Sequence, residues 1–212
     1  WDTGISKNKH GKYGQLRGTK LYWHRNTPKQ GKYSWVENDK KNKELVNRIQ
    51  PVKPGIKFRS RIRFENLSKE EVGALLFVLD LPPGHYHKIG MGKPHGLGSI
   101  RITPELTITN RTDEAGRYNN LFKGETWNMA KKTIAMEDFK EAFEKYMINE
   151  LKTNTDSLWK TERLNELLLM LDWGKTGNDS WLERTRYLEI EHGKGKENEY
   201  KNRPVLPRPS KY

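Results

Sequence analysis

Hydrophobic and polar residues alternate strictly between Ile56 and Phe64, and this is the clearest pattern in the chain. One set of alternate positions holds Ile56, Phe58, Ser60, Ile62 and Phe64. The other set holds Lys57, Arg59, Arg61 and Arg63. A period of two predicts a strand with one buried apolar face and one cationic face.

A capped helix is predicted directly after this strand. Ser68 is a good N-cap residue, and Glu71, three residues later, completes a capping box. An apolar stripe then follows at helical spacing, at Val72, Leu75, Leu76 and Leu79. The sequence Pro82-Pro83-Gly84 predicts the end of the helix.

A glycine-rich loop, His87 to Gly98, comes next and contains Gly90, Gly92, Gly96 and Gly98. It is neither a Walker loop, since no Gly-Lys-Ser/Thr follows, nor a dinucleotide fingerprint, since it precedes a strand. Glycine lets a backbone approach phosphate closely, and Lys88, Lys93 and His95 add side-chain donors. The alternative is a connection that only needs the positive φ of glycine.

A second strand is predicted after this glycine loop. Ile100 and Ile102 point inward in it, and Arg101 points outward beside the cationic strand. Pro104 interrupts the strand, which Leu106 and Ile108 continue. A strand, a helix and a second strand within about 50 residues form half of a ferredoxin-like, split βαβ unit.

The rest of the chain extends this α+β domain. We predict a linker over 1–15, the domain over 16–130 with a strand at 16–24, and a long loop over 25–54 with a short helix near 42–49. Helices at 136–151 and 160–173 form a helical pair within 131–180. A short strand at 187–190 and an extended, proline-rich tail at 202–212 complete the last segment, 181–212.

Charge is distributed very unevenly along the chain. It has 212 residues and a net charge of +13, and residues 1–66 hold 17 Lys or Arg against 5 Asp or Glu. Uneven positive charge of this kind indicates a polyanionic partner, most often nucleic acid. The alternative is a basic surface that faces only water.

Several classes of protein are excluded by composition. The chain contains no cysteine, so disulfides and thiolate chemistry are absent. It has no apolar run of about 18 residues, and therefore no expected transmembrane helix. A chain without cysteine is expected in the reducing cytoplasm. The first residue is Trp1 and no signal region follows, so we expect either a piece of a longer protein or a processed form. No cofactor is expected.

Three histidines, His85, His87 and His95, lie in or beside the glycine loop. His85 and His87 have a metal-ligand spacing, but no third ligand is evident. A histidine general base for RNA cleavage is one interpretation, and a histidine that contacts RNA or solvent is the other.

Three segments together resemble the C-terminal half of a RAMP domain, the RNA-binding domain of CRISPR effectors. They are Phe58-x-x-x-Ile62-x-Phe64-Glu-Asn-Leu-Ser68, Glu71-x-Gly73-Ala-Leu-Leu76 and Ile89-Gly-Met-Gly-x-x-x-Gly-x-Gly98. The upstream Leu16 to His24 and the closing Arg203 to Pro207 are similar to the fused RAMP proteins of type III systems.

This resemblance implies a ferredoxin-like, RRM-related fold that holds CRISPR RNA and its complementary target RNA, together with other RAMP domains or effector subunits. RAMP proteins of type III effectors cut target RNA with an aspartate in the N-terminal half of the domain. Asp2 and Asp39, the aspartates before the matched strand, lie in no matching motif, so no catalytic residue is carried over. A related protein processes precursor CRISPR RNA with a histidine and without metal, which is the alternative function.

The predicted RNA-binding surface combines the cationic strand, the glycine loop and the companion strand. Its residues are Lys57, Arg59, Arg61, Arg63, Lys88, Gly90, Gly92, Lys93, His95, Gly96, Gly98 and Arg101.

Overall fold

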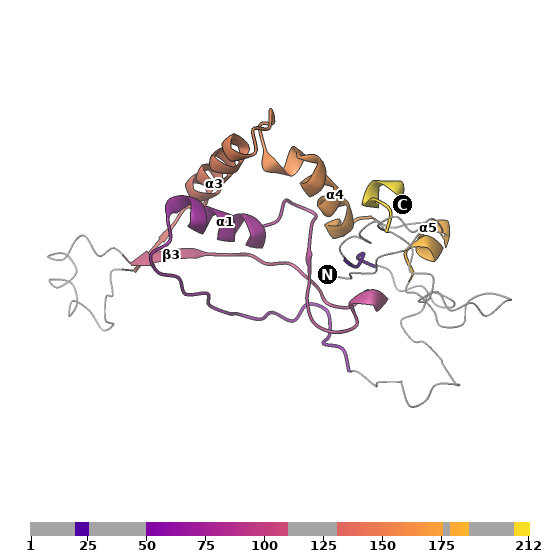
Figure 1. Cartoon of the computed structure of the whole chain (residues 1–212). Coiled ribbons are helices and arrows are strands. Elements are labelled where there is room, and N and C mark those ends of the chain that lie inside the picture. Colours follow the sequence, from indigo (N-terminus) through magenta and orange to yellow (C-terminus); the bar gives the residue numbers. More distant parts are fainter. Residues whose placement is uncertain (1–19, 26–49, 110–130, 176–178, 187–205) are drawn as a thin grey trace, which may run out of the picture. The chain divides into compact units, whose positions relative to one another are not determined.

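The computed structural model describes residues 20–25, 50–109, 131–175, 179–186 and 206–212 (Figure 1). The described helices are α1 (Lys69–Leu79), α3 (Glu137–Glu150), α4 (Glu162–Leu171) and α5 (Asp179–Arg184). The described strands are β1 (His87–Lys88), β2 (Ser99–Ile100), β3 (Leu106–Thr109) and β4 (Lys131–Ile134). Single 3₁₀ turns are η2 (Lys93–His95), η3 (Leu158–Lys160) and η4 (Pro209–Lys211). The predicted α+β class is confirmed.

The chain divides into two compact units, each built from separate stretches of sequence. The first unit comprises Trp1–Ser60, Pro83–Arg101 and Thr161–Tyr212. The second comprises Arg61–Pro82 and Ile102–Lys160. The helices α3 and α4, predicted as a pair, belong to different units, with α3 in the second and α4 in the first.

Helix α1 of the second unit begins as the sequence predicts. The Ser68 hydroxyl accepts from the Glu71 N–H at 3.2 Å, and the Glu71 carboxylate accepts from the Ser68 N–H at 2.7 Å. This reciprocal capping box satisfies two backbone donors that a helix start leaves unpaired. The helix ends at Leu79, three residues before Pro82.

The core of the second unit lies between α1 and the antiparallel pair β3–β4 (Figure 1). Val72, Leu76 and Leu106 are buried, and Phe64 and Ile108 pack against them. The predicted burial of the apolar stripe of α1 is therefore confirmed at Val72 and Leu76. Its partner in the sheet is Leu106 on β3.

Helix α1 also packs against α3 at very close range, and Phe139 of α3 contacts the same core. A Cβ atom at Gly73 would lie 2.0 Å from the carbonyl oxygen of Phe139 and 2.8 Å from Cβ of Phe143. Only glycine allows this approach, so Gly73 is a packing residue of the interface. An ion pair of 2.8 Å between Lys140 and Asp80 joins the same two segments.

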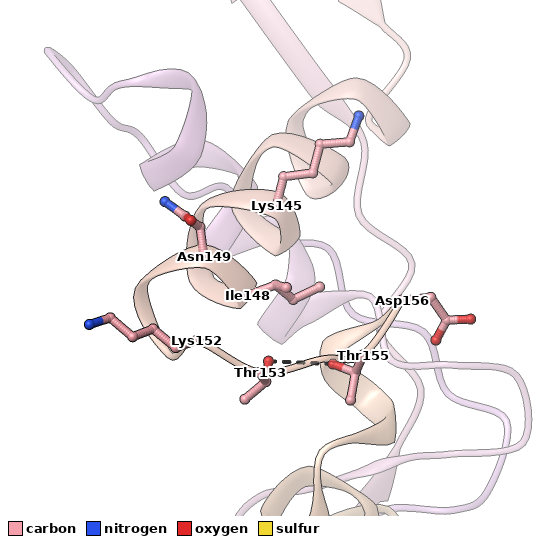
Figure 2. A pocket seen from close by; sticks show the side chains of 7 residues that line it. All are labelled: Lys145, Ile148, Asn149, Lys152, Thr153, Thr155 and Asp156. Atoms are coloured by element: carbon pink, nitrogen blue, oxygen red, sulfur yellow. Dashed lines mark hydrogen bonds between the residues drawn. The ribbon is translucent and has the colours of Figure 1, made fainter.

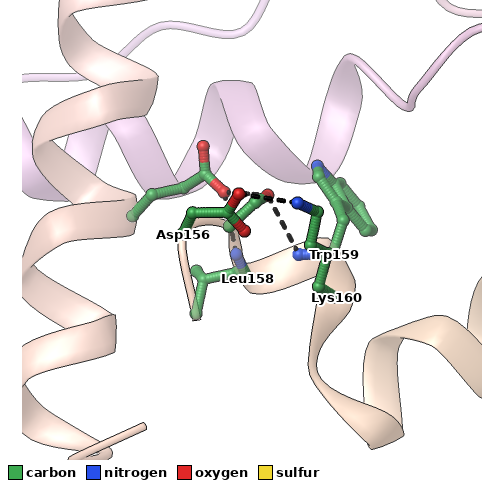
Figure 3. A network of polar contacts seen from close by, with 6 residues as sticks. Asp156, Leu158, Trp159 and Lys160 are labelled. Atoms are coloured by element: carbon green, nitrogen blue, oxygen red, sulfur yellow. Dashed lines mark hydrogen bonds and ion pairs between the residues drawn. The ribbon is translucent and has the colours of Figure 1, made fainter. Parts of the chain in front are cut away.

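The turn after α3 completes this unit. Phe77 of α1 stacks on Trp159, with ring centroids 4.2 Å apart and planes inclined by 12°. The Glu144 carboxylate accepts from the Leu158 N–H at 3.0 Å, and Lys160 pairs with Asp156 at 2.6 Å (Figure 3). These contacts hold η3 against the two helices.

In the first unit, residues 84–86 run antiparallel to residues 171–173 at the end of α4. The Tyr86 N–H donates to the Leu171 carbonyl and the Trp173 N–H to the Gly84 carbonyl, each at 2.9 Å. The C-terminal turn η4 docks on α4, because Glu166 accepts from the backbone N–H and the hydroxyl of Ser210.

The predicted strand over 56–64 is wrong. No residue between 50 and 64 lies in a helix or strand, and the supposed buried face is exposed: 56% at Ile56, 81% at Phe58 and 54% at Ile62. An alternating pattern shows which side chains would lie on the same face of a strand. A strand also needs a neighbouring strand to form its backbone hydrogen bonds. Within the described residues no such neighbour pairs with this segment.

Other expectations have mixed outcomes. Residues 20–25, the described part of the predicted 16–24 strand, form no strand, and the tail forms the turn η4 at its end.

The interruption at Pro104 is confirmed, because it separates β2 from β3. The pairs β1–β2 and β3–β4 form separate sheets, and the ferredoxin-like arrangement stays a prediction. The linker, the 42–49 helix and the 187–190 strand lie outside the described residues.

Candidate nucleic-acid interface

Every residue from Lys53 to Arg63, here the cationic segment, is exposed to solvent. It carries five cations and no acidic residue, namely Lys53, Lys57, Arg59, Arg61 and Arg63. None of them forms an ion pair with another residue of the described ranges. Like charges so close together in sequence repel one another, so this segment favours a polyanion as its neighbour.

The glycine loop adopts a defined conformation at the end of β1. Gly90, Gly92, Gly96 and Gly98 all have positive φ, between 70° and 90°. The Gly92 carbonyl accepts from the N–H groups of His95 and Leu97, at 3.0 and 3.2 Å. These angles agree with the alternative interpretation of the loop, a connection that needs the positive φ of glycine. Contact of the loop with phosphate stays a prediction.

Lys88 fills the inside of this loop. Its ammonium group donates to the carbonyl oxygens of Gly96 and Leu97, each at 3.1 Å. Burial and the nearby charge of Arg25 lower the pKa of Lys88 to about 8. Lys88 therefore holds the loop from within, whereas the sequence analysis expects it to project toward RNA.

The first unit contains a buried histidine, His24, which the sequence analysis leaves without a role. The side chain of His24 is buried, with only 1% of it exposed. Its Nε2 lies 2.9 Å from the Tyr86 carbonyl oxygen and must donate, because a carbonyl only accepts. Its Nδ1, 2.8 Å from the Ser99 hydroxyl, then accepts in the neutral ring.

The neighbour of His24, Arg25, supports the loop directly. A Cβ atom at Gly96 would lie 2.8 Å from Cβ of Arg25, so glycine lets the two segments touch. The Arg25 guanidinium donates to the Thr185 carbonyl at 3.1 Å, and burial lowers its pKa. The predicted site thus has a supporting layer that only the three-dimensional structure reveals.

The remaining predicted site residues are placed less closely together. Lys93 and His95 are half-buried at the two ends of η2, and Arg101 is exposed directly after β2. No hydrogen bond or ion pair among the described residues links Lys57 or Arg59 to the glycine loop. The structure therefore brings Lys88, Gly96 and Gly98 together and leaves the spatial relation of the loop to the cationic segment a prediction.

Two of the three histidines proposed for chemistry lie near the base of the loop, and the third, His95, lies in η2. His85 and His87 are half-buried, and His85 Nδ1 donates to the Pro83 carbonyl at 3.0 Å. Among the described residues, no group of three or more His, Asp or Glu could hold a metal ion.

A shallow hollow lies at the C-terminal end of α3 in the second unit (Figure 2). It is lined by Lys145, Ile148, Asn149, Lys152, Thr153, Thr155 and Asp156. Figure 2 shows these side chains spread around an open rim rather than converging on one point. The hollow therefore has no arrangement typical of a catalytic centre.

Comparison of the chain with protein-family models, with curated proteins and with solved structures found no match. Within the described residues, every helix is too short or too polar to cross a membrane.

Proposed function

We propose that this chain is an RNA-binding module of a type III CRISPR effector. In this proposal a ferredoxin-like RAMP domain holds CRISPR RNA and the guide–target duplex in a cytoplasmic ribonucleoprotein for antiviral defence. The motifs that resemble RAMP proteins support the family, and other RAMP domains or effector subunits are the expected protein partners.

The observation that carries the RNA-binding part of the proposal is the exposed cationic segment. Arg59, Arg61 and Arg63 are exposed, and no acidic residue lies between Gln50 and Phe64. A polyphosphate backbone neutralises such a row of charges and releases its own counterions, which favours binding. A protein surface that faced only water would gain nothing from this concentration of charge.

Salt dependence of RNA binding tests the proposal. Each phosphate contact that is lost should flatten the slope of log K against log salt by roughly 0.7 for a single strand. The triple variant Arg59→Ala, Arg61→Ala, Arg63→Ala should therefore bind more weakly and lose roughly 2 units of slope. A matched control removes three exposed cations elsewhere, at Lys131, Lys132 and Lys145.

An unchanged slope in the arginine variant, or an equal change in the lysine control, would refute a specific role for the segment. Incubation with a repeat-containing RNA and EDTA tests the alternative, processing by His85, His87 or His95. We expect binding without cleavage, and cleavage that histidine substitution abolishes would identify an endoribonuclease instead.

A further inference from the structure

Residues 89–91, the first part of the glycine loop and here called the tip, present two large apolar side chains to solvent. Ile89 is 58% exposed and Met91 is 75% exposed. Gly90 between them has φ 78° and would have open space around a Cβ atom. The tip therefore projects apolar groups on both sides of an uncrowded glycine.

This tip rests on a well-connected base. The Ile89 N–H donates to the Gly98 carbonyl at 2.8 Å, which closes the loop at the first residue of this segment. Lys88 binds two loop carbonyls from inside, and Gly92 accepts two backbone N–H groups. A preorganised loop loses little conformational entropy when its tip binds another molecule.

The charge around the tip indicates which kind of molecule that is. Between Leu81 and Pro104 the chain has no Asp or Glu, and besides Lys88 inside the loop it has two cations, Lys93 and Arg101. An apolar tip within an acid-free, positively charged stretch matches a ligand that combines negative charge with flat apolar surfaces. Unpaired RNA has both, in its phosphates and in the faces of its bases.

We propose that Ile89 and Met91 contact unpaired nucleobases of the bound RNA. This inference rests on the proposed RNA-binding function and adds to it an apolar contribution to affinity. Apolar side chains that enter a base stack keep neighbouring bases apart. In a duplex the bases are already stacked and paired, so the tip should favour single-stranded RNA.

The test uses the full chain and a single-stranded RNA that carries 2-aminopurine, whose fluorescence rises when the base is unstacked. The variant Ile89→Thr, Met91→Ser should bind at least about tenfold more weakly, because tenfold is the effect of losing the burial of only one such side chain. The factor should be similar at about 50 and about 200 mM salt, because the lost contact is uncharged. Wild-type protein should raise the fluorescence, and the variant should not.

Two matched changes separate the tip from general effects. Val78→Thr alters an apolar residue of α1 that is 59% exposed, and it should leave binding unchanged. Met91→Leu keeps an apolar side chain of similar size and should bind as wild type.

Wild-type affinity of the tip variant for single-stranded RNA, or no fluorescence rise with wild-type protein, would overturn the inference. Equal dependence on the tip when the same RNA is in a duplex would overturn the preference for unpaired bases. If binding responds to the arginine variant but not to the tip variant, only this inference fails. If no RNA binds, the proposed function fails with it.

Discussion

The ammonium group of Lys88 donates to the carbonyl oxygen of Gly96 at 3.1 Å, inside the glycine loop. The two residues are eight positions apart, and this bond spans the loop together with a second bond, also 3.1 Å, to Leu97. Lys88 therefore acts as an internal support, and the loop surface that meets a ligand is formed by other residues.

Lys88→Met should destabilise the first unit. The variant keeps most of the aliphatic side chain but leaves the Gly96 and Leu97 carbonyls without their donor, which costs about 1–3 kcal/mol when such groups are buried. Urea unfolding measures the loss. Lys93→Met is the control in the same loop and should change stability much less, so equal losses in both variants would contradict the internal role.

The pH dependence of stability should report Lys88 as well. Burial, followed by the charge of Arg25, lowers its pKa from 10.5 to about 8 in the folded state. Between these two values the unfolded chain binds more protons, so Lys88 makes the free energy of unfolding rise with pH in this window. The difference between wild type and Lys88→Met, measured from pH 8 upward, should grow in favour of wild type. A constant difference would argue against a lowered pKa.

Structural features whose sequence signal lies within a few neighbouring residues are predicted correctly. The Ser68–Glu71 capping box and the positive φ of Gly92 and Gly96 are confirmed, because each depends on residues only a few positions apart. The break at Pro104 is another such case.

Predictions that depend on distant partners are less successful. The alternation over 56–64 describes a strand, but pairing requires a neighbour that periodicity does not identify. His24 and Arg25 have no recognisable motif, since their roles come from Tyr86, Ser99 and Thr185, 62 to 160 positions away. From the sequence alone Lys88 is expected to be an exposed cation. Only the three-dimensional structure shows that it donates hydrogen bonds inside the loop.

His24→Phe should test the buried histidine of the first unit. Phenylalanine keeps a planar ring but cannot donate to the Tyr86 carbonyl, and an unpaired buried acceptor costs about 1–3 kcal/mol. Denaturant unfolding measures this. His85→Phe is the control, because the Pro83 carbonyl that His85 binds is exposed to water, and it should have a smaller effect.

The same variant should also change the acid sensitivity of the protein. Burial is the largest influence on His24, and it lowers the pKa of the ring below its ordinary 6.5. The stability that His24 contributes is present above pH 6.5 and is lost as the pH falls through the folded-state pKa, because the unfolded chain then binds the extra proton. In His24→Phe the free energy of unfolding should fall less steeply as the pH drops from 6.5 to the folded-state pKa of His24. An unchanged slope would show that other groups dominate acid unfolding.

Gly98 and Gly90 offer a matched pair for separating strain from crowding. Both have positive φ, 73° and 78°, so alanine at either position has a left-handed backbone that costs roughly 1–2 kcal/mol. At Gly90 the new Cβ atom meets open space, whereas at Gly98 it would lie 1.9 Å from the Ile89 carbonyl oxygen. Gly98→Ala must therefore also disturb the backbone that closes the loop.

Gly90→Ala should lower the free energy of unfolding by the conformational cost alone, and Gly98→Ala should lower it substantially more. Hydrogen exchange at the Ile89 amide gives an independent readout, because its bond to the Gly98 carbonyl is the contact that a Cβ atom at Gly98 displaces. That amide should lose protection in Gly98→Ala and keep it in Gly90→Ala. Equal losses of stability and protection in the two variants would mean that backbone conformation alone, and not close packing behind the tip, makes glycine necessary at Gly98.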